Sequence, residues 1–177
     1  SFVLALTVGL LAFLAVDMWN EAQETAAAAV GALNATVLIP LLALLTRIYV
    51  SWVFLKSGWL KVSDWETTKY LFHDEYHVPL LPPDVAAVVG AAGELFFPTL
   101  LIVGLCGRLS ALGLQAVNVL AVVSYAHVLL SDGYEGAIAQ HYLWGFMLVM
   151  LAVYGPGPWS IDGWLQRTTP RDRIATS

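Results

Sequence analysis

Four long apolar stretches constrain the fold of this chain more than any other feature. A helix that crosses the hydrocarbon core of a bilayer needs about 20 mostly apolar residues. Stretches of this kind run from Asn34 to Leu55, from Asp84 to Cys106, from Arg108 to Leu130 and, slightly shorter, from Ala137 to Tyr154. A helix is suited to the bilayer because it satisfies its own backbone hydrogen bonds there. The sequence therefore predicts an all-α integral membrane protein built on a four-helix bundle.

The composition agrees with a chain whose main solvent is lipid. Hydrophobic residues make up 59% of the 177 residues and charged residues only 12%, about half of the roughly 25% that is typical of soluble domains. The net charge is −5 at pH 7, with eight Lys and Arg in all, which excludes the basic surface that nucleic acid requires. The only cysteine, Cys106, excludes an internal disulfide and a CxxC redox pair. The partner that this composition predicts is the lipid bilayer.

The ends of the chain differ in character from the four stretches. Residues 2–16 are apolar but short, so their length alone leaves them between a short span and a signal-type segment; we expect an ordered membrane helix. The Ala-rich residues 20–33 should form a surface helix. The chain thus divides into an N-terminal apolar helix with an Ala-rich connector (1–33), a transmembrane bundle (34–165) and a polar C-terminal tail (166–177).

The segment between the first two stretches is too charged to enter hydrocarbon. Residues 59–72 combine aromatic side chains with four charges, which predicts an amphipathic segment lying at the membrane interface. Lys and Arg near the ends of the expected spans are slightly more numerous on the side of the C-terminal tail. We therefore expect the C-terminus to be cytoplasmic.

A few polar residues fall near the middle of the expected spans. At a rise of about 1.5 Å per residue, Arg47 and Glu94 both lie near the bilayer midplane. A charge facing lipid there is costly, so we expect these two residues to face inward as an ion pair. Gln115, Asn118 and Tyr125 share one helix face beside that pair. This network has two interpretations: it holds helices together, or it forms a site that binds a ligand or moves protons.

The histidines map to one membrane face, that of the loop between the first two spans. His77, His127 and His141 form a candidate quinone or metal face, because a neutral imidazole can ligate copper, iron or haem and can hydrogen-bond a quinone oxygen. The alternative is that each is a histidine that only hydrogen-bonds within the bundle. His73 and His77 have helical ligand spacing, but Pro79 ends any helix there, so they are a weak metal motif.

Three ordered motifs extend the pattern over residues 46–165. They are RIYVSWVFLKSGWLK, LFHDEYHVPLLPPDVAAVVGAAGELFFPTLLIVGLCGRLSAL and HYLWGFMLVMLAVYGPGPWSIDGWL. In this order they resemble the DoxX family of bacterial four-helix membrane proteins. On this resemblance, the following residues occupy family-pattern positions: Arg47, Ser57, Gly58, Lys61, Glu94, Gly104, Arg108, Gly155, Gly157, Ser160 and Asp162.

The resemblance implies a function associated with redox chemistry. The family is named after a subunit of a thiosulfate:quinone oxidoreductase, so we expect a membrane subunit in a bacterial inner membrane, assembled with other membrane or redox subunits. Quinone is the first candidate cofactor, ahead of haem and copper. Two other functions stay open: a noncatalytic accessory or assembly subunit, and copper or small-solute handling. The resemblance assigns no catalytic residues, so whether the chain is a quinone-linked oxidoreductase subunit also stays open.

Overall fold

The computed structural model describes the backbone of residues 2–169 and the side chains of residues 13–169. Contacts divide the chain into two units, Ser1–Pro40 and Leu41–Ser177. No strand occurs among residues 2–169. The elements are α1 (Phe2–Leu33), the π-helix η1 (Asn34–Leu38), α2 (Ile39–Ser63), α3 (Trp65–Asp74), α4 (Pro83–Val103), α5 (Gly107–Ser124), α6 (Ala126–Leu129), α7 (Glu135–Tyr154) and α8 (Ile161–Thr168).

The expected all-α membrane architecture is confirmed. Four helices in the described part of the chain are long and apolar enough to cross a membrane, namely the continuous helix Phe13–Ser63 and the helices Pro83–Val103, Gly107–Ser124 and Glu135–Tyr154. The protein is therefore an integral membrane protein. Of the polar tail expected over residues 166–177, residues 170–177 lie outside the described part.

The described residues of the N-terminal unit, 2–40, are helical throughout. The apolar stretch ends at Asp17, but the helix does not, because α1 continues through the Ala-rich residues to Leu33. Good helix formers such as Ala carry the backbone past the charged residues without a break. η1 then leads directly into α2, which ends at Ser63 rather than near Leu55 as the apolar pattern alone suggested.

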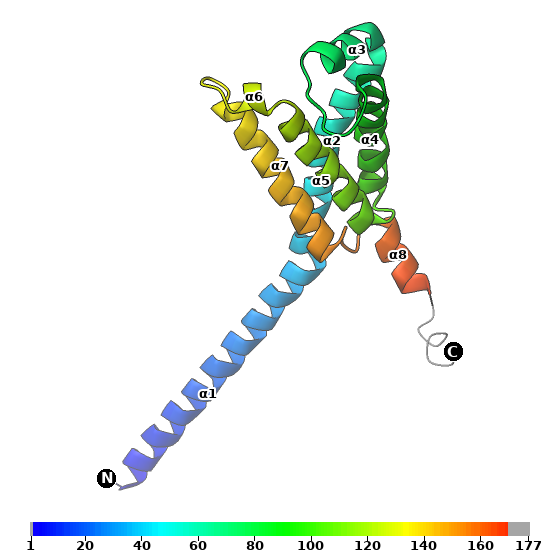
Figure 1. The fold of residues 1–177 in the computed structure, drawn as a ribbon. Coiled ribbons are helices and arrows are strands. Elements are labelled where there is room, and N and C mark those ends of the chain that lie inside the picture. Colours follow the sequence, from blue (N-terminus) through cyan, green and yellow to red (C-terminus); the bar gives the residue numbers. More distant parts are fainter. Residues whose placement is uncertain (1, 170–177) are drawn as a thin grey trace. The chain divides into compact units, whose positions relative to one another are not determined.

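The second unit is a bundle in which α5 packs against both α4 and α7 (Figure 1). All four long helices contribute side chains to one core. The core residues are Val50 and Phe54 from α2, Leu101 from α4, Ala111 and Leu114 from α5, and Leu148 and Leu151 from α7. This core lies between two ends of the bundle. We call the end covered by α3 the α3 end, and the end beside the short amphipathic helix α8 the α8 end.

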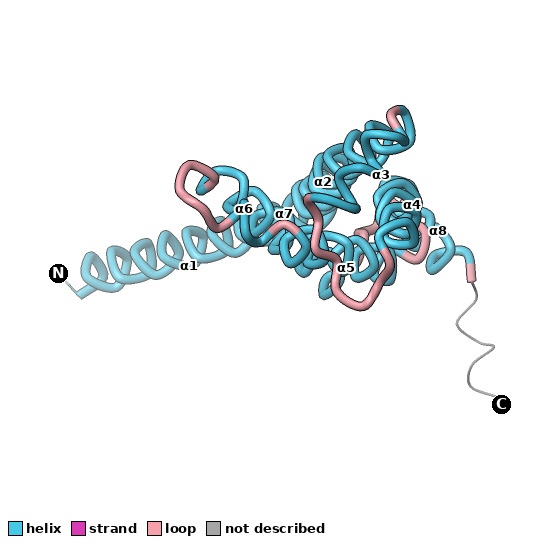
Figure 2. Tube along the Cα trace, turned by 45° about the horizontal axis from the view of Figure 1, so that its top comes forward, coloured by secondary structure: helices cyan, strands magenta, loops and turns pink. Residues whose placement is uncertain are grey.

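The third span is interrupted near its end, which corrects the expected helix from Arg108 to Leu130. α5 ends at Ser124 and the four-residue α6 follows after Tyr125. The backbone N–H of His77 donates to the Ser124 carbonyl oxygen at 2.8 Å. The connection between α3 and α4 thus binds a carbonyl at the end of α5, and Figure 2 shows this connection passing over that end of the bundle.

The amphipathic segment expected over residues 59–72 is present, but as two elements. The last turn of α2 covers its beginning, and α3 begins at Trp65 after Asp64, whose carboxylate accepts the N–H of Thr67 at 3.1 Å. This is the usual N-cap arrangement that starts a helix. Thr68 and Phe72 are the buried residues of α3, and Phe72 packs against Ala86 and Ala87 of α4. α3 therefore covers the end of the bundle.

Close contact between α4 and α5 depends on glycine. A Cβ on Gly113 would overlap the ring of Phe97, and a Cβ on Gly93 would lie 2.8 Å from Cγ2 of Val117. By contrast, a Cβ on Gly136 would have no neighbour within 4 Å. Small residues at such crossings allow helix backbones in a membrane to pack closely.

Replacing Gly113 by Ala should therefore lower the free energy of unfolding by about 1–3 kcal/mol, the usual cost of overpacking. Gly136→Ala adds the same methyl group in open space and serves as the matched control. Denaturant unfolding of both variants in one detergent checks this. Equal stabilities of the two variants would contradict the packing derived for α4 and α5.

Candidate functional site

An apolar cavity lies inside the bundle at its α3 end. Its volume is about 310 Å³, and α2, α3, α4, α5, α6 and α7 all contribute to its lining, together with the connection between α3 and α4. Aromatic rings form much of the wall, among them Phe54, Phe72, Tyr76 and Trp144. Only a few charged or polar groups reach it. Ligand sites typically combine such a lining with a few convergent polar groups.

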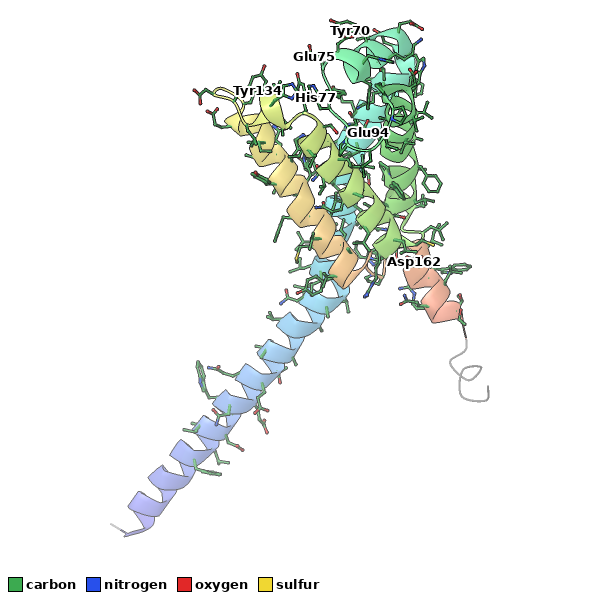
Figure 3. The ribbon with its side chains drawn as sticks, viewed as in Figure 1. Tyr70, Glu75, His77, Glu94, Tyr134 and Asp162 are labelled. Atoms are coloured by element: carbon green, nitrogen blue, oxygen red, sulfur yellow. The ribbon has the colours of Figure 1, made fainter. Side chains whose placement is uncertain are left out.

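The strongest polar group of the cavity is an ion pair between α2 and α4. Nζ of Lys61 lies 2.7 Å from Oε2 and 2.9 Å from Oε1 of Glu94, and it also donates to Oγ of Ser57 at 2.9 Å. The two charged side chains are only 18% and 8% exposed, and all three residues line the cavity. The three N–H donors of the ammonium are thus fully used. Glu94 lies within the bundle in Figure 3.

The ion pair expected between Arg47 and Glu94 is wrong. Glu94 pairs with Lys61. This is possible because α2 continues to Ser63, so that Lys61 lies on this helix next to α4. Arg47 precedes Lys61 by 14 residues on α2, a separation of about 21 Å along the helix axis. The Arg47 side chain is 1% exposed and its Nη2 donates to the carbonyl oxygen of Trp159 at 2.6 Å. Arg47 therefore belongs to the opposite end of the bundle.

That opposite end is held together by a second carboxylate, Asp162. Its two oxygens accept the backbone N–H groups of Cys106 at 2.9 Å and of Gly107 at 2.7 Å, where α5 begins. Its own N–H donates to the carbonyl oxygen of Gly104. Figure 3 shows Asp162 where α8 meets the bundle. A carboxylate at a helix N-terminus satisfies free N–H groups and favours the helix dipole, so this arrangement ties α8 to the bundle.

The second polar wall of the cavity involves α5 and α7. Nδ1 of His141 lies 2.9 Å from Oδ1 of Asn118, and Nδ2 of Asn118 donates to the backbone carbonyl of His141 at 3.0 Å. Asn118 is 3% exposed, and the His141 ring meets that of Trp144 edge to face with centroids 4.9 Å apart. Gln115 also faces α7, since its amide lies next to Gly145. Of these residues, His141 and Trp144 line the cavity.

Two tyrosines, Tyr76 and Tyr125, line the cavity toward the α3 end. The ring of Tyr76 contacts those of Phe72 and Tyr125 edge to face, at centroid distances of 5.0 and 5.1 Å. Burial raises the pKa of the Tyr76 phenol, and the charge of Glu94 and neighbouring groups acts in the same direction. Tyr76 therefore stays a neutral hydroxyl, able to donate and accept a hydrogen bond.

The structure brings only part of the expected histidine face together. The rings of His77 and His127 lie edge to face at 4.9 Å, whereas His141 makes its contacts with Asn118 and Trp144. His73 instead approaches Asp84 at 3.1 Å on the surface. Among the described side chains, no group of three or more His, Cys, Asp and Glu is placed to hold one metal ion.

The structure also brings together only part of the expected polar network around Arg47 and Glu94. Gln115 and Asn118 do share a face, but it is directed at α7, and Tyr125 lies at the break after α5. Composition and depth did not identify Lys61, Ser57 or Trp144 as site residues. The spacing of Ser57 and Lys61, one helical turn apart, carried the missing signal, because residues at i and i+4 share a helix face.

Three comparisons with known proteins bear on this site. A family model described as DoxX matches residues 42–127. An uncharacterized protein of Haemophilus influenzae is 28% identical over 134 residues, which cover 72% of this chain and 85% of that protein. No solved structure matches the chain. The range matched by the family model contains Lys61, Glu94 and Asn118 but not His141.

Because the Lys61 and Glu94 pair is buried, removing one partner should strand the other charge. We expect Lys61→Met to lower the free energy of unfolding by about 3–5 kcal/mol, and the double variant Lys61→Met with Glu94→Leu to recover most of that loss. Lys69→Met is the matched control, since it breaks the exposed pair of Lys69 with Glu66 and should change stability little. Urea unfolding in detergent measures all three. A Lys61→Met variant as stable as Lys69→Met would refute the buried pair.

Proposed function

We propose that this chain, which over residues 42–127 belongs to the DoxX family, is a membrane subunit of a redox system and that its cavity binds the headgroup of a membrane quinone. The proposal rests on the position of the cavity inside a membrane bundle and on the chemistry of its lining. It identifies the α3 end as the functional end and treats the Arg47 and Asp162 contacts at the α8 end as structural.

The size and the lining of the cavity both suit a planar quinone ring that enters from the bilayer. A volume of about 310 Å³ is at the lower end of the range for ligand pockets, roughly 300–1,000 Å³. It accommodates a headgroup rather than a whole isoprenoid chain, which would stay in lipid. The rings of Phe54 and Trp144, whose centroids lie 5.7 Å apart, supply apolar faces against which a planar ring can pack.

A buried donor without a partner is the observation that carries the proposal. Nε1 of Trp144 is buried and has no hydrogen-bond partner among the described residues, although Trp144 lines the cavity. Leaving such a donor unsatisfied costs about 1–3 kcal/mol. The nitrogen has almost no accessible surface, so a ligand oxygen would remove that cost with a rotation of the indole that turns Nε1 toward the cavity. Further polar groups, Tyr76, Tyr125 and Glu94, line other parts of the same cavity. A quinone, with oxygens on opposite edges of its ring, can meet polar groups on two walls.

The setting of this site is also part of the proposal. We propose a bacterial inner membrane with the α8 end cytoplasmic, residues 34–165 as the DoxX-like bundle, and residues 1–33 and 166–177 as additions to it. Electrons would be exchanged with another membrane or redox subunit, because the protein's contribution to quinone chemistry is binding, orientation and proton exchange. The cavity residues described above are suited to those three tasks.

Filling the cavity should weaken binding without unfolding the bundle. Ala121 lines the cavity, whereas Val123 of the same helix is 49% exposed and does not line it. We expect Ala121→Phe to weaken binding of decylubiquinone at least about tenfold, a loss of roughly 1.4 kcal/mol, and Val123→Phe to leave it unchanged. Equilibrium binding to the purified proteins in detergent measures both.

Equal affinities of wild type, Ala121→Phe and Val123→Phe would contradict a headgroup site in this cavity. Absence of quinone binding by the wild-type protein would contradict the proposed function itself. In that case the noncatalytic accessory subunit becomes the better interpretation of the chain.

A further inference from the structure

The hydrogen bonds between Asn118 and His141 determine which nitrogen of His141 carries the proton. Nδ2 of Asn118 donates to the backbone carbonyl oxygen of His141 at 3.0 Å. This bond fixes the orientation of the amide, because the flipped amide would place two carbonyl oxygens against each other. Oδ1 of Asn118 therefore faces Nδ1 of His141, 2.9 Å away. An amide oxygen only accepts, so Nδ1 must be the donor.

A neutral imidazole has one N–H, so Nε2 of His141 is then unprotonated. Among the described residues Nε2 has no hydrogen-bond partner, and His141 lines the cavity. The other ionisable groups that line it are Lys61, Glu94, Tyr76 and Tyr125. The three donors of Lys61 are already bound to Ser57 and Glu94. His141 is thus a cavity-lining residue whose Nε2 acceptor is free, because the lining ammonium of Lys61 has no donor left for it.

We propose that Nε2 of His141 accepts a hydrogen bond from a hydroxyl-bearing ligand, so that the site selects the quinol over the quinone. This inference rests on the proposed function and adds the redox form of the ligand, the accepting atom and the role of Asn118. A quinone oxygen only accepts hydrogen bonds and would face the lone pair of Nε2. A quinol hydroxyl donates to it, which turns an unfavourable contact into a hydrogen bond.

The hydrogen bond that this geometry allows needs no further reactant. The ligand keeps its O–H bond, Nε2 accepts the hydrogen bond, and both the ligand and the imidazole ring stay neutral. Nδ1 keeps its hydrogen bond to Asn118, because Nδ1 carries the single N–H of the neutral ring. Asn118 is accordingly a positioning residue, since it acts on the ligand through His141.

The tautomer can be measured without any ligand. A variant with His73, His77 and His127 all replaced by Gln leaves His141 as the only histidine of the four in the chain. Its ring nitrogens, labelled with ¹⁵N and observed at about pH 8.5, two units above the ordinary pKa of histidine, should show Nδ1 protonated and Nε2 bare. Asn118→Leu in the same background should allow both tautomers, and Asn118→Asp should restore Nδ1 protonation. If Nδ1 of His141 is unprotonated in the triple variant that keeps Asn118, the inference is overturned.

Ligand selection is tested with decylubiquinol, decylubiquinone and the dimethyl ether of the quinol, which keeps the ring but lacks both hydroxyls. Wild-type protein should bind the quinol about tenfold more tightly than either of the others, the usual penalty when a built hydrogen bond is not made. His141→Phe should remove that preference, while His73→Gln on the surface should keep it.

The two proposals fail in different ways. Equal affinity for the three ligands, with the Nδ1 tautomer confirmed, contradicts selection of the quinol by His141 but leaves a headgroup site in the cavity. Failure to bind any of the three contradicts the quinone site as well. Retention of the quinol preference in His141→Phe overturns the role of His141, because another group must then accept the hydroxyl.

Discussion

A charge that enters a bilayer must be paired, and the bond between Lys61 and Glu94 shows how this chain meets that constraint. An unpaired carboxylate of Glu94, in the middle of the membrane helix α4, would be costly. Lys61 reaches it only because α2 continues beyond its apolar stretch. The pair thereby ties α2 to α4 beside the cavity and keeps a polar group at its wall. The length of α2, the packing of α3 over the end of the bundle and the shape of the cavity are linked through this one contact.

The bundle has two ends with different roles. At the α8 end, Arg47 and Asp162 bind backbone groups, namely the carbonyl of Trp159 and the N–H groups at the start of α5, while Nε and Nη1 of Arg47 are buried without a partner among the described residues. Such contacts hold turns and helix ends in place. At the α3 end, polar side chains line the cavity, Nε1 of Trp144 is buried without a partner, and Nε2 of His141 makes no hydrogen bond among the described residues. Because the cavity lies at the α3 end, we expect chemistry directed at a ligand there.

Much of the fold could be predicted from the sequence because its signals are long and local. Apolar stretches of span length identified the four membrane helices, and the charged, aromatic residues 59–72 identified the segment that became α3. The break after Ser124 could not be predicted, since it depends on a hydrogen bond from His77, which is 47 residues earlier in the chain. Tertiary contacts of this kind leave no periodic pattern.

The candidate site was only partly predictable for a related reason. Depth counting correctly placed Glu94 inside the bundle, but it chose Arg47 as the partner because it assumed that the helix ended near Leu55. The helix continues eight residues further, to Ser63, about 12 Å along its axis, and this extension carries Lys61 to Glu94. The role of Asn118 was visible only as a polar residue on a helix face, and its partner on α7 depended on how α5 and α7 pack. Pairwise partners follow from packing, which sequence periodicity alone does not specify.

Photolabelling with an azido-substituted quinone, followed by peptide mapping, tests the central claim most directly. If the cavity is the headgroup site, labels should fall on lining residues such as Phe54, Ala121 and Trp144, and excess decylubiquinone should suppress them. Labels confined to the lipid-exposed surfaces of the helices, and unchanged by the competitor, would contradict the account.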